Sequence, residues 1–147
     1  MMKKFNVRVY GILIVNKCLL VSDEYINGQE ITKLPGGGLE FGEGTHACIV
    51  REIKEELNLA VEVSGHFYTT DFFVASAFNP NSQVISIYYT LTALEEFRFP
   101  VSEIPFNFEE KKEGAQALRW LPIAQLSEND FTFAIDKKVA GLITKYD

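Results

Sequence analysis

Three glutamates near the end of a predicted helix are spaced so that their carboxylates lie together. Glu52, Glu55 and Glu56 fall at positions i, i+3 and i+4, and therefore share one helix face. Their like charges repel, and the C-terminal end of a helix disfavours negative charge. A divalent cation offsets both effects, because Mg²⁺ takes hard oxygen ligands and sits between carboxylates and phosphates. Such acids alone usually mark a solvated helix face, so the metal interpretation depends on what precedes them.

A glycine-rich segment and an arginine precede these acids. Residues 34–44 read LPGGGLEFGEG, and glycine lets the backbone turn sharply and approach a ligand closely. We expect a sharp bend there, with a carbonyl oxygen of this loop available to a metal. Arg51 lies four residues before Glu55 and partly offsets the negative charge. Loop, arginine and acids at this spacing together predict a metal site.

The segment follows one pattern of glycine, acids, arginine and apolar residues: Gly37, Glu43, Arg51, Glu52, Ile53, Glu55, Glu56 and Leu59. This pattern resembles the signature of the Nudix family, which are hydrolases of nucleoside diphosphates linked to another group. It departs at one position, where Asn58 replaces the usual glycine, and asparagine tolerates the left-handed conformation at a helix C-terminus. Outside these residues, the resemblance is in the order of strands and helices.

The resemblance implies an enzyme that hydrolyses a pyrophosphate bond with Mg²⁺, or Mn²⁺ as the alternative ion. The implied metal ligands are Gly36 or Gly37 through a carbonyl, Glu52, Glu55 and Glu56. The implied catalytic residues are Arg51, Glu52, Glu55 and Glu113. Arg51 orients the carboxylates, Glu52 is a ligand or the general base, and Glu43 supports the loop. Glu113, in a predicted loop over 95–113, is the alternative base or extra ligand, ahead of Glu110 and Glu109.

The expected substrate is a small nucleotide, with a (d)NTP or related nucleotide, as for MutT-like members, ranked first. The alternatives are an ADP-ribose or nucleotide-sugar pyrophosphatase and a catalytically silent nucleotide-binding regulatory module. The complete set of acids favours the enzyme over the silent module. An isopentenyl diphosphate isomerase is disfavoured, because the two histidines are scattered and no cysteine lies in a pocket-like motif.

Composition limits the remaining classes. The 147 residues fit a single domain over 1–147, and 47% of them are hydrophobic. The net charge of −6 argues against binding nucleic-acid polymers. Cys18 and Cys48 lack metal-ligand spacing and are interpreted as reduced thiols of a cytoplasmic protein. We expect neither a signal peptide nor a membrane span, and a homodimer through an exposed strand edge is left open.

The sequence pattern predicts alternating strands and helices. Strands are expected over 5–15, 18–21, 67–74, 84–94 and 117–121, with a tight turn at 16–17, a loop over 23–30, a turn at 79–82 and a helix over 136–145. The catalytic helix is expected from Thr45, as its N-cap, to about Leu57, with Ile49 and Ile53 on its apolar stripe. Periodicity indicates α+β or α/β. The resemblance implies the Nudix α/β/α sandwich, a curved mixed sheet between two main helices.

The predicted strands on either side of the 79–82 turn carry many aromatic residues, among them Phe72, Phe73, Tyr88 and Tyr89. Aromatic residues are enriched in strands, so we interpret these rings as core and sheet packing. One of them stacking on a nucleotide base is the alternative.

Overall fold

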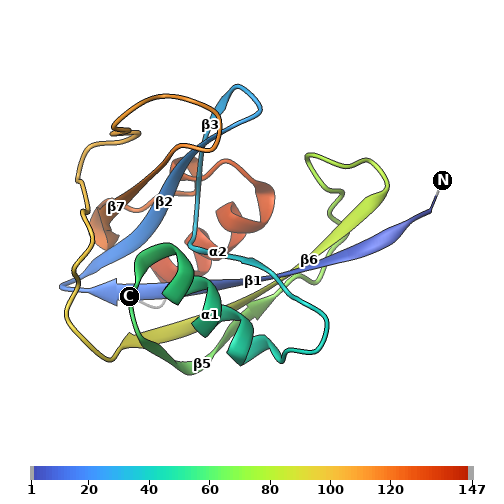
Figure 1. Cartoon of the computed structure of the whole chain (residues 1–147), viewed down its shortest axis with the longest axis horizontal. Coiled ribbons are helices and arrows are strands. Elements are labelled where there is room, and N and C mark those ends of the chain that lie inside the picture. The colour runs from blue at the N-terminus through green and yellow to red at the C-terminus, as the bar shows by residue number, and fades with distance from the viewer. Residues whose placement is uncertain (1, 146–147) are drawn as a thin grey trace. The chain divides into compact units, whose positions relative to one another are not determined.

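The computed structural model describes residues 2–145, which form two compact units. Residues 2–12 and 36–98 make one unit, which contains helix α1 (Thr45–Leu57). Residues 13–35 and 99–145 make the other, which contains helix α2 (Ala134–Lys145). The first strand, β1 (Lys4–Val15), contributes residues to both units (Figure 1).

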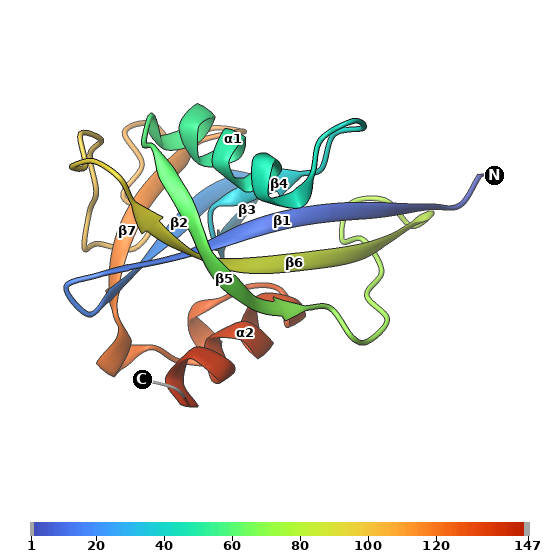
Figure 2. The ribbon, with the colours of Figure 1, turned by 90° about the horizontal axis from the view of Figure 1, so that it is seen from below.

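Four strands form the sheet of the α1 unit: β1 up to Ile12, β4 (Gly36–Gly38), β5 (Val61–Thr69) and β6 (Ser82–Ala93). β6 lies between β1 and β5 and is antiparallel to β5, and β4 pairs antiparallel with β1 (Figure 2). Helix α1 packs on this sheet at Gly11, where a Cβ would lie 3.5 Å from Ile49 Cδ1. A Cβ on Gly11 would also overlap the Leu91 side chain of β6, so the glycine leaves room for Leu91 and Ile49.

Helix α1 has the predicted length and the predicted apolar stripe. Ile49, Ile53 and Leu57 are buried, and Asn58 ends the helix in the left-handed conformation, with φ 51°. The predicted N-cap is wrong, because Gly44 occupies that position and no side chain caps the helix. The Thr45 hydroxyl instead forms a 2.6 Å hydrogen bond with the Tyr89 hydroxyl of β6. A partner distant in sequence has thus replaced the local capping bond.

The glycine-rich segment is partly a strand rather than a sharp bend. Gly36 and Gly37 pair with Tyr10 and Val9 of β1. Gly36 has φ 150°, and a Cβ there would lie 2.7 Å from the Tyr10 Cα. Glycine is therefore required at Gly36 because two backbones lie in close contact.

One predicted strand of the α1 unit is misplaced. The strand expected over 84–94 is β6, but the strand expected over 67–74 is instead β5, which begins at Val61 and ends at Thr69. The register of β5 shifts between Val63 and Gly65 and again between His66 and Tyr68. These irregularities interrupt the alternation of apolar and polar residues by which a strand is recognised from sequence. Residues 70–81 then connect the two strands through the predicted turn, in which Ser82 N donates to Asn79 O.

The aromatic residues of this unit divide into two groups. Tyr88 and Tyr89 of β6 are buried, and the Tyr88 ring stacks on Tyr10 with centroids 5.3 Å apart. This confirms the packing interpretation for the strand rings. Phe72 and Phe73, in the 70–81 connection, are exposed.

In the α2 unit, strand β2 (Cys18–Ile26) lies between β3 (Gln29–Lys33) and β7 (Gln116–Pro122) and is antiparallel to both. The predicted hairpin at 16–17 is confirmed, since Asn16 and Lys17 both have positive φ and the end of β1 pairs with β2. The predicted loop over 23–30 is wrong: β2 continues to Ile26 and β3 begins at Gln29. Polar residues occupy these strands because partners elsewhere in the unit satisfy them, as for Asp23 and Arg119 at 2.8 Å.

The last part of the chain forms β7, two short 3-10 helices, η1 (Ile123–Gln125) and η2 (Glu128–Asp130), and then α2. The predicted strand and helix of this region are confirmed, and α2 buries Ile135, Val139 and Ile143 at four-residue spacing. The predicted loop over 95–113 contains no helix and only a single bridge, between Ser102 and Arg119. No helix between residues 2 and 145 is long and apolar enough to cross a bilayer.

Candidate active site

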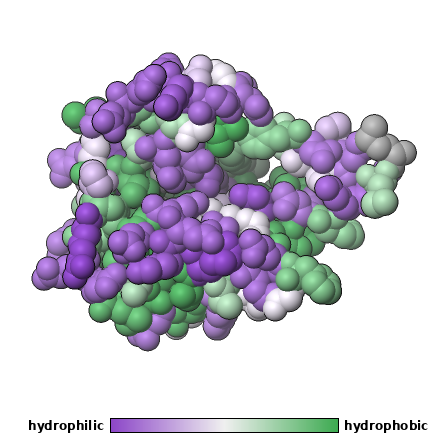
Figure 3. All heavy atoms as spheres, viewed as in Figure 1, coloured by the Kyte–Doolittle hydropathy of each residue, from purple (hydrophilic) through white to green (hydrophobic). Residues whose placement is uncertain are grey.

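The acids of the predicted metal site project from the middle and end of α1, beside β4. Arg51, Glu52 and Glu55 occupy one side of the helix, while Ile49 and Ile53 face the sheet. The outward surface of α1 is hydrophilic (Figure 3). The helix thus has one apolar face that packs on the sheet and one charged face that is accessible to a ligand.

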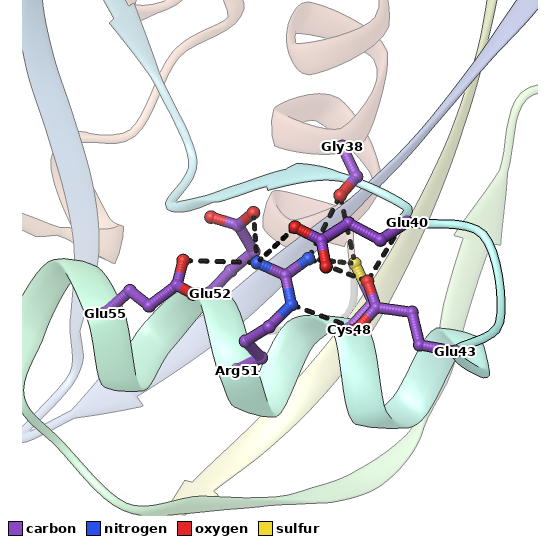
Figure 4. Close-up of polar contacts among 7 residues, drawn as sticks. All are labelled: Gly38, Glu40, Glu43, Cys48, Arg51, Glu52 and Glu55. Carbon is purple, nitrogen blue, oxygen red and sulfur yellow. Dashed lines mark hydrogen bonds and ion pairs between the residues drawn. The ribbon is translucent and has the colours of Figure 1, made fainter.

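Arg51 connects this helix to the preceding loop (Figure 4). Its Nε and Nη2 donate to the two carboxylate oxygens of Glu43, at 3.0 and 2.7 Å. Its Nη1 donates to Glu52 and to Glu55, each at 3.1 Å, and Nη2 also donates to the Gly38 carbonyl at 3.2 Å. A planar guanidinium with five donors suits such a shared role. One cation therefore positions three carboxylates and the loop backbone.

The pairing with Arg51 changes the acidity of Glu43. The Arg51 guanidinium, which donates two hydrogen bonds to this carboxylate, lowers the pKa of Glu43 from its ordinary 4.5 to about 2, and the backbone N–H of Glu40 adds to the effect. The same hydrogen bond from Arg51 to Glu43 raises the pKa of the guanidinium. Glu43 is therefore ionised at neutral pH, where it pairs with Arg51.

Glu52 packs against the glycine segment. A Cβ on Gly37 would lie 2.5 Å from the Glu52 carboxyl carbon, so the absence of a side chain there leaves the space that the carboxylate fills. The Glu52 side chain is only 14% exposed, whereas that of Glu55 is 59% exposed. One oxygen of Glu56, Oε2, is buried. The side chains of the three glutamates thus differ in their exposure to solvent.

The donor set fits a hard divalent cation. Carboxylate oxygens of Glu52, Glu55 and Glu56 and the carbonyls of Gly36 and Gly37 are the oxygen ligands that Mg²⁺ prefers. Within residues 2–145, however, no three His, Cys, Asp or Glu side chains converge in a geometry that could hold a metal. In this structure the Arg51 guanidinium is bonded to Glu43, Glu52 and Glu55. Glu55, the most exposed of the three, would have to leave Arg51 to serve as a metal ligand.

Three groups beside Arg51 were not predicted from the sequence. The Gly38 carbonyl accepts from Arg51 and from the Cys48 thiol at 3.6 Å, and Glu40 lies 3.8 Å from the guanidinium. Burial raises the pKa of the Cys48 thiol to about 12, so this cysteine stays protonated and unreactive. Glu40 could have been identified from its place between the glycines and Glu43, whereas a backbone carbonyl leaves no signal in the sequence.

Glu113, the predicted additional base or ligand, belongs to the α2 unit. Its carboxylate accepts hydrogen bonds from the backbone N–H groups of Asn27 and Gly28, at 2.9 and 3.4 Å. Both residues form the turn between β2 and β3 and have positive φ. The contacts give Glu113 a structural role in that turn, and its part in catalysis stays a prediction.

Comparison with known proteins identifies the family. A sequence model of the NUDIX domain matches residues 4–140. A MutT Nudix hydrolase from Burkholderia pseudomallei is 17% identical with a TM-score of 0.71, covering 95% of this chain and 98% of its own. The MutT protein from Methanosarcina mazei Go1 is 15% identical with a TM-score of 0.69, covering 99% and 97%.

An ADP-ribose pyrophosphatase from Streptococcus suis 89-1591 is also similar, at 18% identity and a TM-score of 0.54, covering 96% of this chain and 90% of its own. These identities are low, so the structures establish the fold, and they confirm the fold class inferred from the sequence. The family match spans residues of both units and supports a pyrophosphohydrolase. The chain belongs to the Nudix family.

Proposed function

We propose that the chain hydrolyses a pyrophosphate bond in a (d)NTP or related small nucleotide, with Mg²⁺ as the cofactor. The observation that carries this proposal is the arrangement around Arg51, in which one guanidinium organises Glu43, Glu52 and Glu55 on α1 and its preceding loop. Such a concentration of carboxylates repels an anionic substrate that carries no cation. It favours an anionic substrate that is bound to a divalent cation.

The roles of the individual residues follow from their contacts. Glu55 and Glu56 are the principal proposed metal ligands, with Glu52 and a carbonyl of Gly36 or Gly37 beside them. When bound, the metal neutralises phosphate oxygens and makes water more acidic. Glu52 accepts a hydrogen bond from Arg51 and fills the space beside Gly37, and we assign its carboxylate as the base that would accept the proton of the attacking water.

Arg51 acts as a positioning residue. Its bond to Glu55 would be given up if Glu55 served as a metal ligand, while its two bonds to Glu43 would keep the guanidinium in place. Arg51 thereby keeps its charge near Glu52 and steadies that carboxylate through the reaction. Glu113 remains the alternative base, although its carboxylate holds the β2–β3 turn.

Two further points concern substrate and compartment. The two MutT structures superpose on this chain with higher TM-scores than the ADP-ribose pyrophosphatase does. This order supports testing (d)NTPs first. Cys18 and Cys48 are free thiols, which agrees with the proposed reducing cytoplasm.

The test is product analysis with a matched pair of variants. The chain is incubated with Mg²⁺ and canonical or oxidised (d)NTPs, ADP-ribose, nucleotide sugars or dinucleoside polyphosphates, and released phosphate, pyrophosphate and monophosphates are measured. We expect pyrophosphate and a nucleoside monophosphate from a triphosphate. Glu56→Gln should reduce kcat on the order of 100- to 1000-fold with an unchanged melting temperature, while Lys54→Gln, on the same helix, should not.

Three results would contradict parts of the proposal. Full activity of Glu56→Gln at saturating Mg²⁺ would show that the metal site is misassigned. Cleavage of ADP-ribose or a nucleotide sugar, but of no triphosphate, would support the proposed pyrophosphate hydrolysis and contradict the proposed substrate. Nucleotide binding without any turnover would favour a regulatory module.

A further inference from the structure

A groove of about 370 Å³ lies at the N-terminal end of β1, within the α1 unit. Six of the residues that line it are Lys3, Lys4, Phe5, Phe73, Asn81 and Gln83, and we call it the N-terminal groove. Along β1, Phe5 precedes Val9, the partner of Gly37, by four residues, or about 13 Å of extended strand. None of the lining residues belongs to α1 or to the loop before it, so the groove is separate from the candidate active site.

Three extended segments build the groove. Lys4 N donates to Asn81 O at 3.1 Å, which joins the start of β1 to the start of β6. On the other side, Ala75 forms an antiparallel bridge with Gln83, so the 70–81 connection extends the sheet by a third segment (Figure 2). Ala75 and Gln83 are therefore neighbours, and both line the groove together with Phe73.

Five side chains of this surface serve as its recognition groups, those of Lys3, Lys4, Phe5, Phe73 and Gln83. Phe5 and Phe73 are 67% and 71% exposed, and neither ring contacts another ring among residues 2–145. No carboxylate in that range lies within ion-pair distance of Lys3 or Lys4, and no side-chain hydrogen bond involves Gln83. Two cations, two aromatic faces and one amide thus surround the same space.

We propose that the N-terminal groove binds a free nucleotide. Aromatic side chains stack on bases because every base has a π-face, and lysine ammonium groups bind phosphate as point charges. The Gln83 amide offers a donor and an acceptor side by side, which matches the edge of a purine such as adenine. The volume of the groove is within the range of small-molecule sites.

Charge disfavours two other occupants. A second copy of the chain on a two-fold axis would bring the lysines of both copies together, and the lining contains no Asp or Glu to neutralise them. A nucleic-acid polymer would meet the net charge of −6 of the whole chain, whereas one nucleotide meets the local lysines only. A single anionic, planar ligand therefore fits best.

The first experiment measures AMP binding to the full chain in buffer containing a metal chelator. Without a divalent ion, the carboxylates around Arg51 repel phosphate, so binding at the active site and turnover are both suppressed. We expect calorimetry to show AMP binding that is at least about tenfold tighter than that of adenosine or inorganic phosphate. Backbone NMR shifts should change around residues 3–5, 73–75 and 81–83. This readout does not depend on the proposed hydrolase activity.

Matched variants test the individual contacts. Phe73→Ser should weaken AMP binding about tenfold, whereas Phe72→Ser, an exposed neighbour that does not line the groove, should not. The double change Lys3→Gln and Lys4→Gln should weaken binding and flatten its dependence on salt, while Lys145→Gln should leave both unchanged. All of these side chains are exposed, and a melting curve checks that each variant is folded.

The proposal is overturned by any of four results. AMP fails to bind at about 5 mM, a concentration far above the dissociation constant expected of a stacked, charge-paired nucleotide. Phe72→Ser and Phe73→Ser weaken binding equally. A single-stranded oligoadenylate binds more tightly than AMP. The chain self-associates with concentration in a way that Phe73→Ser abolishes, which would assign the groove to a second copy.

Discussion

Two arginines, one in each unit, hold carboxylates in opposite ways. Arg119 of β7 makes a two-point contact with a single acid, donating from Nε and Nη2 to Asp23 at 2.8 and 3.1 Å. The Asp23 side chain is fully buried, and its oxygens also accept from the Thr32 hydroxyl and the Phe106 N–H. Arg51 is partly exposed and is shared among Glu43, Glu52 and Glu55.

The difference separates a structural ion pair from the cluster that we propose to bind a metal. The Asp23–Arg119 pair is neutral as a whole, and its hydrogen bonds join β2, β3, β7 and the loop that contains Phe106. The Arg51 cluster keeps an excess of negative charge, since one cation meets several acids. Such an excess is unfavourable for stability, and it is useful where a cation is to be bound.

The largest expected effect tests the buried pair. Arg119→Leu leaves the Asp23 carboxylate buried without its cation, which should lower the free energy of unfolding by about 3–5 kcal/mol. Urea denaturation followed by circular dichroism measures this loss. The double variant Asp23→Leu with Arg119→Leu should recover most of it, because no buried charge remains. A loss below about 1 kcal/mol for Arg119→Leu would mean that the pair is no stronger than an exposed one.

The next effect tests the shared arginine. Arg51→Lys replaces a fork that holds several oxygens by a single ammonium group. We expect kcat/KM to fall about 10- to 100-fold, as for other residues that orient metal ligands. The free energy of unfolding should change by less than about 1 kcal/mol, because the cluster is partly exposed. If Arg51 positions the metal ligands, the activity of Arg51→Lys should also depend less on Mg²⁺ concentration, which a loss of general stability would not cause. The comparison fails if Arg51→Lys destabilises the fold as much as Arg119→Leu.

The smallest effect concerns acid stability. The pKa of Glu43 is about 2 in the folded chain, against an ordinary 4.5. Above pH 4.5 the carboxyl is ionised in both states and its stabilisation is fully present. As the pH falls from 4.5 to 2 the unfolded chain takes up the proton first, so this stabilisation is lost progressively.

Glu43→Gln should therefore show a shallower loss of stability than the parent chain over that pH range. Urea denaturation at a series of pH values gives the two slopes. Glu62→Gln, at an exposed position of β5, is the control and should follow the parent. Identical slopes for the parent and Glu43→Gln would show that Arg51 does not lower the pKa of Glu43 in the folded chain.

Local pattern predicted the elements whose stabilising contacts are close in sequence. The stripe of Ile49, Ile53 and Leu57 determines α1, Asn58 ends it, and the spacing of Arg51, Glu52 and Glu55 identifies the family. The 16–17 hairpin and α2 were predicted for the same reason. A helix face and a tight turn are properties of neighbouring residues, so they can be read without knowing the fold.

Tertiary contacts decided what the local pattern missed. Thr45 bonds to Tyr89 instead of capping α1, the polar residues of β2 are strand residues because Arg119 and Lys33 pair with them, and Gly36 is strand backbone because it lies against Tyr10. Arg51 joins Glu43 and Gly38 to the helix for the same reason. In each case the partner is distant in sequence or is a backbone group. The sequence alone determined the helix and the glutamates to which we assign the proposed chemistry. The tertiary structure alone decided which partner each polar group takes, because these partners come within hydrogen-bond distance only when the chain folds.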